Sequence, residues 1–169
     1  MNFENKILSR EISRLIWEKE KTIGTAESCT GGRIAEALVL VPGASNYFKG
    51  SIVSYTNEIK ERLLGVNHDV LEEKTAVCEE VAVAMVKGAI KTLQVDYAIS
   101  ATGIAGPGGG TPEHPVGTIW LACGSADDVV TLKLDEDRGR ALNLSHATTT
   151  ALQLFLDYLK THLEPAEEK

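Results

Sequence analysis

Cysteine is scarce in this sequence, and the three that occur, Cys29, Cys78 and Cys123, stand far apart. No Cys-x-x-Cys pair is present, which argues against a structural zinc site and against a disulfide framework. The chain also lacks an apolar run of membrane-spanning length, and its charged start, MNFENKILSREI, is unlike the apolar core of a secretory signal. We therefore expect a protein of the reducing cytoplasm that has no membrane partner.

Positive charge is also in short supply. Lys and Arg total 17 against 24 Asp and Glu, so the formal net charge is −7. Proteins that bind the nucleic-acid backbone normally carry a basic surplus, so no nucleic-acid partner is expected, although one small basic pocket for a single phosphate stays compatible with these totals. The four histidines show no metal-ligand spacing. We accordingly expect no metal and no other cofactor.

The remaining composition is that of an ordinary globular domain. The 169 residues are 43% hydrophobic and 24% charged, close to globular averages. A core is possible without disulfides or metal, and the length suits a single domain covering residues 1–169. The charged last segment, 164–169, contains a proline and is expected to be a frayed tail.

Helical and strand-like patterns alternate along the first two thirds of the chain, and a hairpin-like pair of strands follows. The apolar spacing predicts helices over residues 4–19, 31–41, 57–64, 69–73, 78–94 and 140–163. Strands are predicted over residues 21–27, 51–55, 96–101, 116–123 and 129–134. This order favours a three-layer α/β/α sandwich with a mixed sheet of about five strands.

The segment TAESCTGGR, residues 25–33, joins the first predicted strand to a helix. Gly31 and Gly32 permit a tight turn, and the first N–H groups of a helix favour negative charge nearby. Ser28 therefore lies where an oxyanion or a phosphate would be stabilised. The alternative is that Ser28 and Thr30 only cap the helix, as such residues commonly do. For Glu27 we favour a local structural role over the orientation of a reacting group.

Three further features follow predicted strands, at the edge where ligands bind in open α/β sheets. One is SYTNEIK, which contains Tyr55 and Lys60; by composition alone, a helical lysine such as Lys60 belongs on the surface. Another is the glycine-rich loop of residues 102–110. The last is the basic pair Arg138 and Arg140 at the start of the final helix.

The glycine-rich loop matches neither of the common phosphate-binding motifs. No Gly-Lys-Ser/Thr follows it, and Pro107 and Pro112 interrupt it before any helix opens. Its backbone N–H groups are nevertheless able to cradle an anion. A flexible connection is the alternative, although long loops in compact domains are often functional.

Taken together and in order, TAESCTGGRIAEAL, FKGSIVSYTNEIKERLLGV, SATGIAGPGGG and PVGTIWLA resemble the C-terminal domain of the competence/damage-inducible protein family, CinA. The resemblance runs from about Thr22 to Ala122 and continues more weakly to the last helix. Stand-alone members of this family are similar to deamidases of nicotinamide mononucleotide. The resemblance thus implies an amidohydrolase that converts this small nucleotide into nicotinate mononucleotide and ammonia, without a cofactor.

The resemblance also assigns roles to single residues. It places the nucleophile on Ser28, the lysine base on Lys60 and an assisting tyrosine on Tyr55. In this scheme, neutral Lys60 takes the proton of Ser28, and N–H groups near the Gly31-Gly32 turn meet the tetrahedral oxygen. The implied substrate-binding set is Gly31, Gly32, Thr102, Gly103, Ala105, Gly106 and Arg140.

The arginine assignment needs a choice, because the segment EDRGRALN departs from the family pattern. Counting back from Ala151 favours Arg140, whereas choosing Arg138 would require two inserted residues. Two rival functions stay open: a non-catalytic nucleotide-binding or regulatory module of the same family, and a phosphoryl-transfer enzyme, which the absence of an acidic metal cluster disfavours. A homodimer is compatible with the apolar helices.

Overall fold

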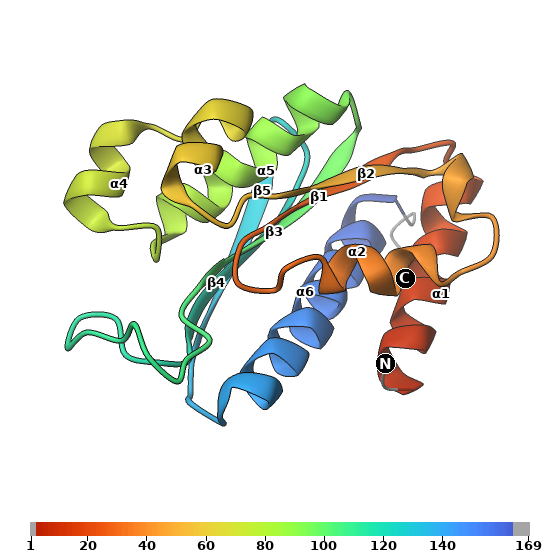
Figure 1. The fold of residues 1–169 in the computed structure, drawn as a ribbon. Coiled ribbons are helices and arrows are strands. Elements are labelled where there is room, and N and C mark those ends of the chain that lie inside the picture. Colours follow the sequence, from red (N-terminus) through yellow and green to blue (C-terminus); the bar gives the residue numbers. More distant parts are fainter. Residues whose placement is uncertain (1–2, 164–169) are drawn as a thin grey trace.

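The structure, a computed structural model, describes residues 3–163, and it consists of one five-stranded sheet between two layers of helices (Figure 1). The strands are β1 (Ile23–Glu27), β2 (Phe48–Val53), β3 (Tyr97–Gly103), β4 (Thr118–Gly124) and β5 (Val129–Asp135). The helices are α1 (Phe3–Glu18), α2 (Arg33–Val39), α3 (Asn57–Leu64), α4 (His68–Lys74), α5 (Glu79–Leu93) and α6 (Arg140–Leu163), with a 3-10 turn at Ala44–Asn46.

The sheet has the strand order β2-β1-β3-β4-β5. Strands β2, β1 and β3 run parallel, whereas β4 is antiparallel to both β3 and β5. The predicted mixed sheet and three-layer architecture are therefore confirmed. Because β1, β2 and β3 are parallel, their carboxyl ends meet at one edge of the sheet, and the loops that leave these ends lie near one another.

Two apolar cores cover the two faces of the sheet. Helices α1, α2 and α6 pack on one face, and α3, α4 and α5 lie on the other (Figure 1). Strand β3 serves both cores, because Ile99 and Ala101 face the first helical layer and Ala98 faces the second. Its side chains are buried on both faces, as its mostly apolar sequence predicts.

Most predicted bounds shift by only a few residues, and two differences have a clear cause. Helix α2 begins at Arg33 rather than at residue 31, because Gly31 and Gly32 adopt left-handed backbone angles, with φ of 60° and 98°. Strand β3 continues to Gly103, where a Cβ atom would lie 2.5 Å from the carbonyl oxygen of Thr118. Glycine is what permits this close strand pairing. The predicted frayed tail, 164–169, lies outside the described residues.

Candidate active site

Strand β1 ends at Glu27, and its hydrogen bonding to both neighbouring strands continues one residue further. The N–H of Ser28 donates to the carbonyl oxygen of Ala101 at 2.8 Å, and the N–H of Ser54 donates to the carbonyl oxygen of Glu27 at 2.8 Å. In this register, Ser28, Ser54 and Thr102 occupy neighbouring positions at the ends of three parallel strands.

These three hydroxyl residues also share a face of the sheet. Side chains alternate between the two faces along a strand. Two positions earlier on each strand, Ala26 and Ile52 pack in the core beneath α3, α4 and α5, and the Ser100 hydroxyl donates to a carbonyl of α5. The hydroxyl residues that follow are therefore directed at the same helical layer, in which Lys60 lies.

Helix α3 carries Lys60 into this layer. The helix begins after Thr56, whose side chain accepts a hydrogen bond from the N–H of Ile59. Lys60 is only 1% exposed, and its Nζ lies 2.9 Å from Ser28 Oγ. The same Nζ donates to the carbonyl oxygen of Ser54 at 2.9 Å. The structure thus brings together Ser28 and Lys60, the two residues predicted as nucleophile and base.

Burial sets the protonation chemistry of this pair. It lowers the pKa of Lys60 below the ordinary lysine value of 10.5, because the ammonium loses its hydration. Burial likewise raises the pKa of the neighbouring Cys29 to about 12, so that thiol stays neutral at physiological pH. An amine with a lowered pKa, within hydrogen-bonding distance of a hydroxyl, is equipped to accept the proton of that hydroxyl.

Glu27 holds the turn that follows Ser28. Its buried carboxylate accepts hydrogen bonds from two hydroxyls and from three N–H groups at the start of α2. The donors are Thr25 Oγ1, Thr30 Oγ1, and the N–H groups of Gly32, Ile34 and Ala35. The local structural role favoured for Glu27 is therefore correct. A carboxylate already occupies the positive end of this helix, so the site does not offer that end to a second anion.

The two glycines of the turn use their N–H groups within the chain. The N–H of Gly31 donates to the carbonyl oxygen of Ser28 at 3.1 Å, and that of Gly32 donates to the Glu27 carboxylate at 3.0 Å. The N–H groups of Gly31 and Gly32 themselves are therefore already engaged in this conformation, and the expectation that N–H groups near this turn meet a tetrahedral oxygen stays a prediction. A contribution of Gly31 and Gly32 to substrate binding stays a prediction, based on the shape of the turn.

The glycine-rich loop is held by the first turns of α6. Arg140 Nη1 donates to the carbonyl oxygen of Gly106 at 2.8 Å, and Asn143 Nδ2 donates to that of Ala105 at 3.1 Å. The predicted arginine and the predicted loop are thus neighbours. Among the described residues, the N–H groups of Gly106, Gly108 and Gly109 have no acceptor, which leaves this part of the loop open to a ligand.

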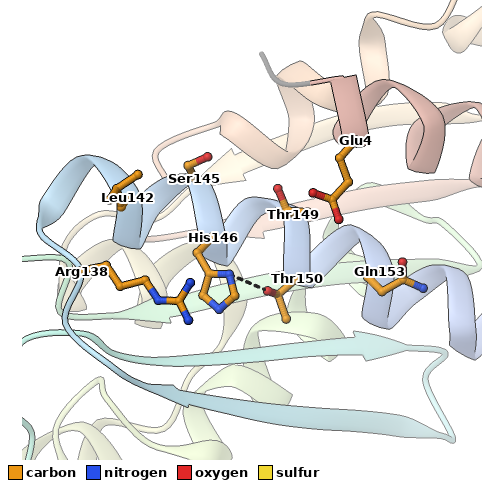
Figure 2. Close-up of a pocket in the computed structure, with 8 residues that line it drawn as sticks. All are labelled: Glu4, Arg138, Leu142, Ser145, His146, Thr149, Thr150 and Gln153. Atoms are coloured by element: carbon orange, nitrogen blue, oxygen red, sulfur yellow. Dashed lines mark hydrogen bonds between the residues drawn. The ribbon is translucent and has the colours of Figure 1, made fainter.

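Arg138 has a different environment. Its guanidinium pairs with the carboxylate of Glu136, and it lines a surface pocket of about 380 Å³ along α6. Figure 2 shows the Arg138 guanidinium beside the ring of His146 in that pocket. Arg140, by contrast, contacts the glycine-rich loop, and its choice over Arg138 as the arginine of the family pattern stays a prediction.

Comparison with known proteins identifies the family to which this chain belongs. The family model described as CinA C-terminal domain matches residues 5–159. The chain belongs to the CinA C-terminal domain family. Related CinA-like proteins include one from Leptospira borgpetersenii serovar Hardjo-bovis, 52% identical over 118 residues, which are 70% of this chain and 28% of the relative. Another, from Cytophaga hutchinsonii, is 43% identical over 94% of this chain and 38% of the relative. The chain thus spans about a third of the length of these CinA-like relatives.

Solved structures of the CinA family have the same fold. The competence/damage inducible protein from Agrobacterium tumefaciens superposes with a TM-score of 0.90 at 34% identity, covering 93% of this chain and 96% of that one. A CinA superfamily protein from Escherichia coli gives a TM-score of 0.87 at 31% identity, covering 91% and 90%. The resemblance found in the sequence motifs is thereby confirmed at the level of family and fold.

The remaining predicted site residues of this CinA-family chain make no hydrogen bond to Ser28 or Lys60. Tyr55 is 59% exposed and has no hydrogen bond to Ser28 or Lys60, so its assisting role stays a prediction. The hydroxyl of Thr102 is buried and donates to the carbonyl oxygen of Ala76 at 2.8 Å. Gly103 lies at the tight β3–β4 pairing described above. Thr102 thus connects β3 to the carbonyl oxygen of Ala76, and Gly103 permits the close pairing with β4. Their part in substrate binding stays a prediction.

Sequence reasoning missed two residues of the site. Ser54 contributes its carbonyl oxygen to Lys60, and Asn143 connects α6 to the glycine-rich loop. Ser54 stands directly before Tyr55 in a quoted motif, so the register of the parallel strands was the signal that would have found it. Within residues 3–163, no group of three or more His, Cys, Asp or Glu side chains is arranged to hold a metal ion. No helix in this part of the chain is long and apolar enough to cross a membrane.

Proposed function

We propose that this chain is an amidohydrolase that converts nicotinamide mononucleotide and water into nicotinate mononucleotide and ammonia. The observation that carries the proposal is the contact of 2.9 Å between Lys60 Nζ and Ser28 Oγ, inside a site where burial lowers the lysine pKa. The choice of substrate rests on the resemblance of the sequence motifs to the deamidases of this family.

In the first half of the reaction, neutral Lys60 accepts the proton of Ser28 while Oγ attacks the carboxamide carbon. The Ser54 carbonyl oxygen holds one N–H of the amine, which leaves the lone pair free to face Ser28. The tetrahedral intermediate then breaks its C–N bond. Lys60 returns the proton to the departing nitrogen, ammonia leaves, and an acyl ester is formed on Ser28.

In the second half, water replaces ammonia. Lys60, neutral again, takes a proton from the water as the oxygen attacks the ester carbon. Collapse of this second intermediate breaks the bond to Ser28 Oγ, which recovers a proton from Lys60. The carboxylic acid so formed releases its proton to water, which leaves the carboxylate of nicotinate mononucleotide and the free enzyme, with Ser28 and Lys60 in their starting states.

The tetrahedral oxygen requires N–H donors near Ser28. Three of the N–H groups in the turn are already engaged, those of Ser28, Gly31 and Gly32. The N–H groups of Cys29 and Thr30 act on the Cys29 sulfur, where they favour the thiolate. A neutral thiol is a weak acceptor. We assign these two N–H groups to the oxyanion, because they can exchange the sulfur for a stronger acceptor at little cost.

The phosphate of the nucleotide needs a separate anchor. The open N–H groups of Gly106, Gly108 and Gly109 lie in the loop that Arg140 contacts. Backbone N–H groups in such loops bind phosphate oxygens, and an arginine fork adds two parallel charge-assisted hydrogen bonds. On this proposal, when the phosphate is bound, the Arg140 guanidinium donates to a phosphate oxygen, either in place of the Gly106 carbonyl oxygen or in addition to it.

The test is to measure ammonia release from nicotinamide mononucleotide, with EDTA present, for the wild type, Ser28→Ala and Lys60→Ala. Turnover by the wild type and its loss in both variants would support the proposal. Near-wild-type turnover by either variant would contradict the Ser28–Lys60 mechanism, and activity restored only by a divalent ion would contradict its metal-free chemistry. Binding of the nucleotide without ammonia release would point to a binding module instead.

A further inference from the structure

Two buried hydroxyls stand out among the described residues 3–163, because they alone of the buried side-chain nitrogen and oxygen atoms there have no hydrogen-bond partner. They are the hydroxyls of Ser9 and Ser54, both 0% exposed. A buried hydroxyl without a partner is costly and calls for an explanation. Ser9 lies in α1, in the helical layer on the opposite face of the sheet from Lys60, whereas Ser54 lies within the site.

Ser54 is the cross-strand neighbour of Ser28. The N–H of Ser54 donates to Glu27, so the pairing of β2 with β1 extends to the position beside Ser28. By strand alternation, both hydroxyls are directed at the layer that contains Lys60. The carbonyl oxygen of Ser54 is 2.9 Å from Lys60 Nζ, so the hydroxyl belongs to a residue that already contacts the amine.

The number of N–H groups on Lys60 changes during the reaction. The neutral amine has two N–H groups and a lone pair, and the Ser54 carbonyl together with Ser28 accounts for one N–H and the lone pair. The ammonium formed by proton transfer has three N–H groups, of which the Ser54 carbonyl and the Ser28 oxygen accept two. The third also lacks an acceptor in the neutral amine, but leaving it unpaired costs more once the buried nitrogen is charged. The Glu27 carboxylate is already surrounded by five donors. The Cys29 thiol, with its pKa raised to about 12, stays neutral.

We propose that Ser54 is a positioning residue of the Ser28–Lys60 pair, and that its hydroxyl accepts an N–H of the Lys60 ammonium when Ser28 has given up its proton. The role in turnover rests on the function proposed above. No bond to Ser54 is made or broken, and the proton stays on Lys60 until it passes to the departing nitrogen. The proposal requires the serine side chain to rotate about χ1 while its backbone carbonyl keeps its contact with the amine.

Three variants test this role: Ser54→Ala removes the hydroxyl, Ser54→Thr keeps it, and Ser9→Ala removes the other unpartnered hydroxyl as a matched control. The first measurement is the pKa of Lys60 by NMR titration of its side-chain signals, which are assigned by their absence in Lys60→Met. We expect Ser54→Ala to lower this pKa by about one unit, because the charged form loses an acceptor. Ser54→Thr should restore the wild-type value, and Ser9→Ala should leave it unchanged.

The second measurement is ammonia release. Ser54→Ala should lower kcat about tenfold while KM stays within about twofold, since the hydroxyl stabilises a charge that develops during the reaction. A Lys60 pKa in Ser54→Ala equal to that in Ser9→Ala would overturn the proposal and leave Ser54 as a merely unpaired buried group. If the wild type released no ammonia, the proposed function would fail, and the NMR comparison would still decide the role of Ser54.

Discussion

The turn that follows Ser28 and the glycine-rich loop of residues 102–110 differ in how many of their polar groups already have partners. In the turn, Ser28 is 8% exposed, Lys60 is 1% exposed, and the N–H groups of both glycines already have acceptors. In the loop, residues 107–113 are exposed, and several N–H groups have no acceptor within the described chain. On the proposed function, the comparison indicates that the reacting groups are buried and in contact before substrate binds, whereas the groups that would hold the rest of the substrate are left without partners.

The largest effect is expected from Lys60→Met, which removes the base but fills the same buried space. On the proposed mechanism, kcat/KM for ammonia release should fall by about 10⁴-fold, the upper range of what a general base contributes. Lys49→Met is the control, because Lys49 is an exposed lysine on β2 and should keep full activity. Activity of Lys60→Met within tenfold of the wild type would show that Lys60 is not the base that activates Ser28.

The next effect concerns stability rather than turnover. Glu27→Ala leaves five donors without their carboxylate, so the free energy of unfolding should fall by about 3–5 kcal/mol. The control is Glu36→Ala, since Glu36 is an exposed acid on α2, the helix whose first N–H groups Glu27 accepts, and its loss should change stability by about 0.5 kcal/mol or less. Urea unfolding measures both. Equal losses would mean that the turn is not held by Glu27.

A smaller effect tests the open region. Arg140→Ala should raise KM for nicotinamide mononucleotide about tenfold, because a charge-assisted contact to the phosphate is lost. Arg138→Ala should leave KM within about twofold, since the Arg138 guanidinium pairs with Glu136 and not with the loop. Steady-state kinetics on the two variants shows which substitution raises KM more. A larger rise in Arg138→Ala would indicate that the phosphate binds in the pocket of Figure 2 instead.

The smallest effect depends on pH and vanishes in alkaline solution. The folded pKa of Lys60 is lowered relative to the unfolded value near 10.5, so the unfolded chain binds the proton more tightly. This costs the wild type stability at neutral pH, and the cost disappears as pH rises through 10.5. Lys60→Met should therefore be more stable than the wild type near pH 7, with the gap closing towards pH 10.5. A gap that widens with pH in thermal unfolding would have the wrong sign.

Much of the fold follows from local patterns. The predicted bounds of 57–64 and 140–163 are those observed for α3 and α6, because a threonine cap precedes α3, a glycine ends it, and the apolar stripe of α6 is long. Strand ends were less predictable, since they depend on pairing. Strand β3 extends to Gly103, beyond its predicted end, because the backbone of β4 approaches closely there.

The candidate site was predictable only in part. Composition alone places a helical lysine on the surface, yet Lys60 lies one turn before buried Leu64 and shares its inward face. The resemblance to the CinA family predicted that Ser28 and Lys60 act together. The five hydrogen bonds of Glu27 and the position of Ser54 were not predicted, because they depend on how the strands and helices pack in three dimensions. Such contacts join residues that no local spacing connects.

The extension of the β1 pairing by one residue on both sides has a consequence for folding. Ser28 lies beside Lys60 only if β2, β1 and β3 are aligned correctly, because a slip by one position turns every side chain of a strand to the opposite side. A misaligned chain would be compact but inert. Recovery of ammonia release after dilution from denaturant would therefore report correct strand alignment, which helical content alone does not reveal.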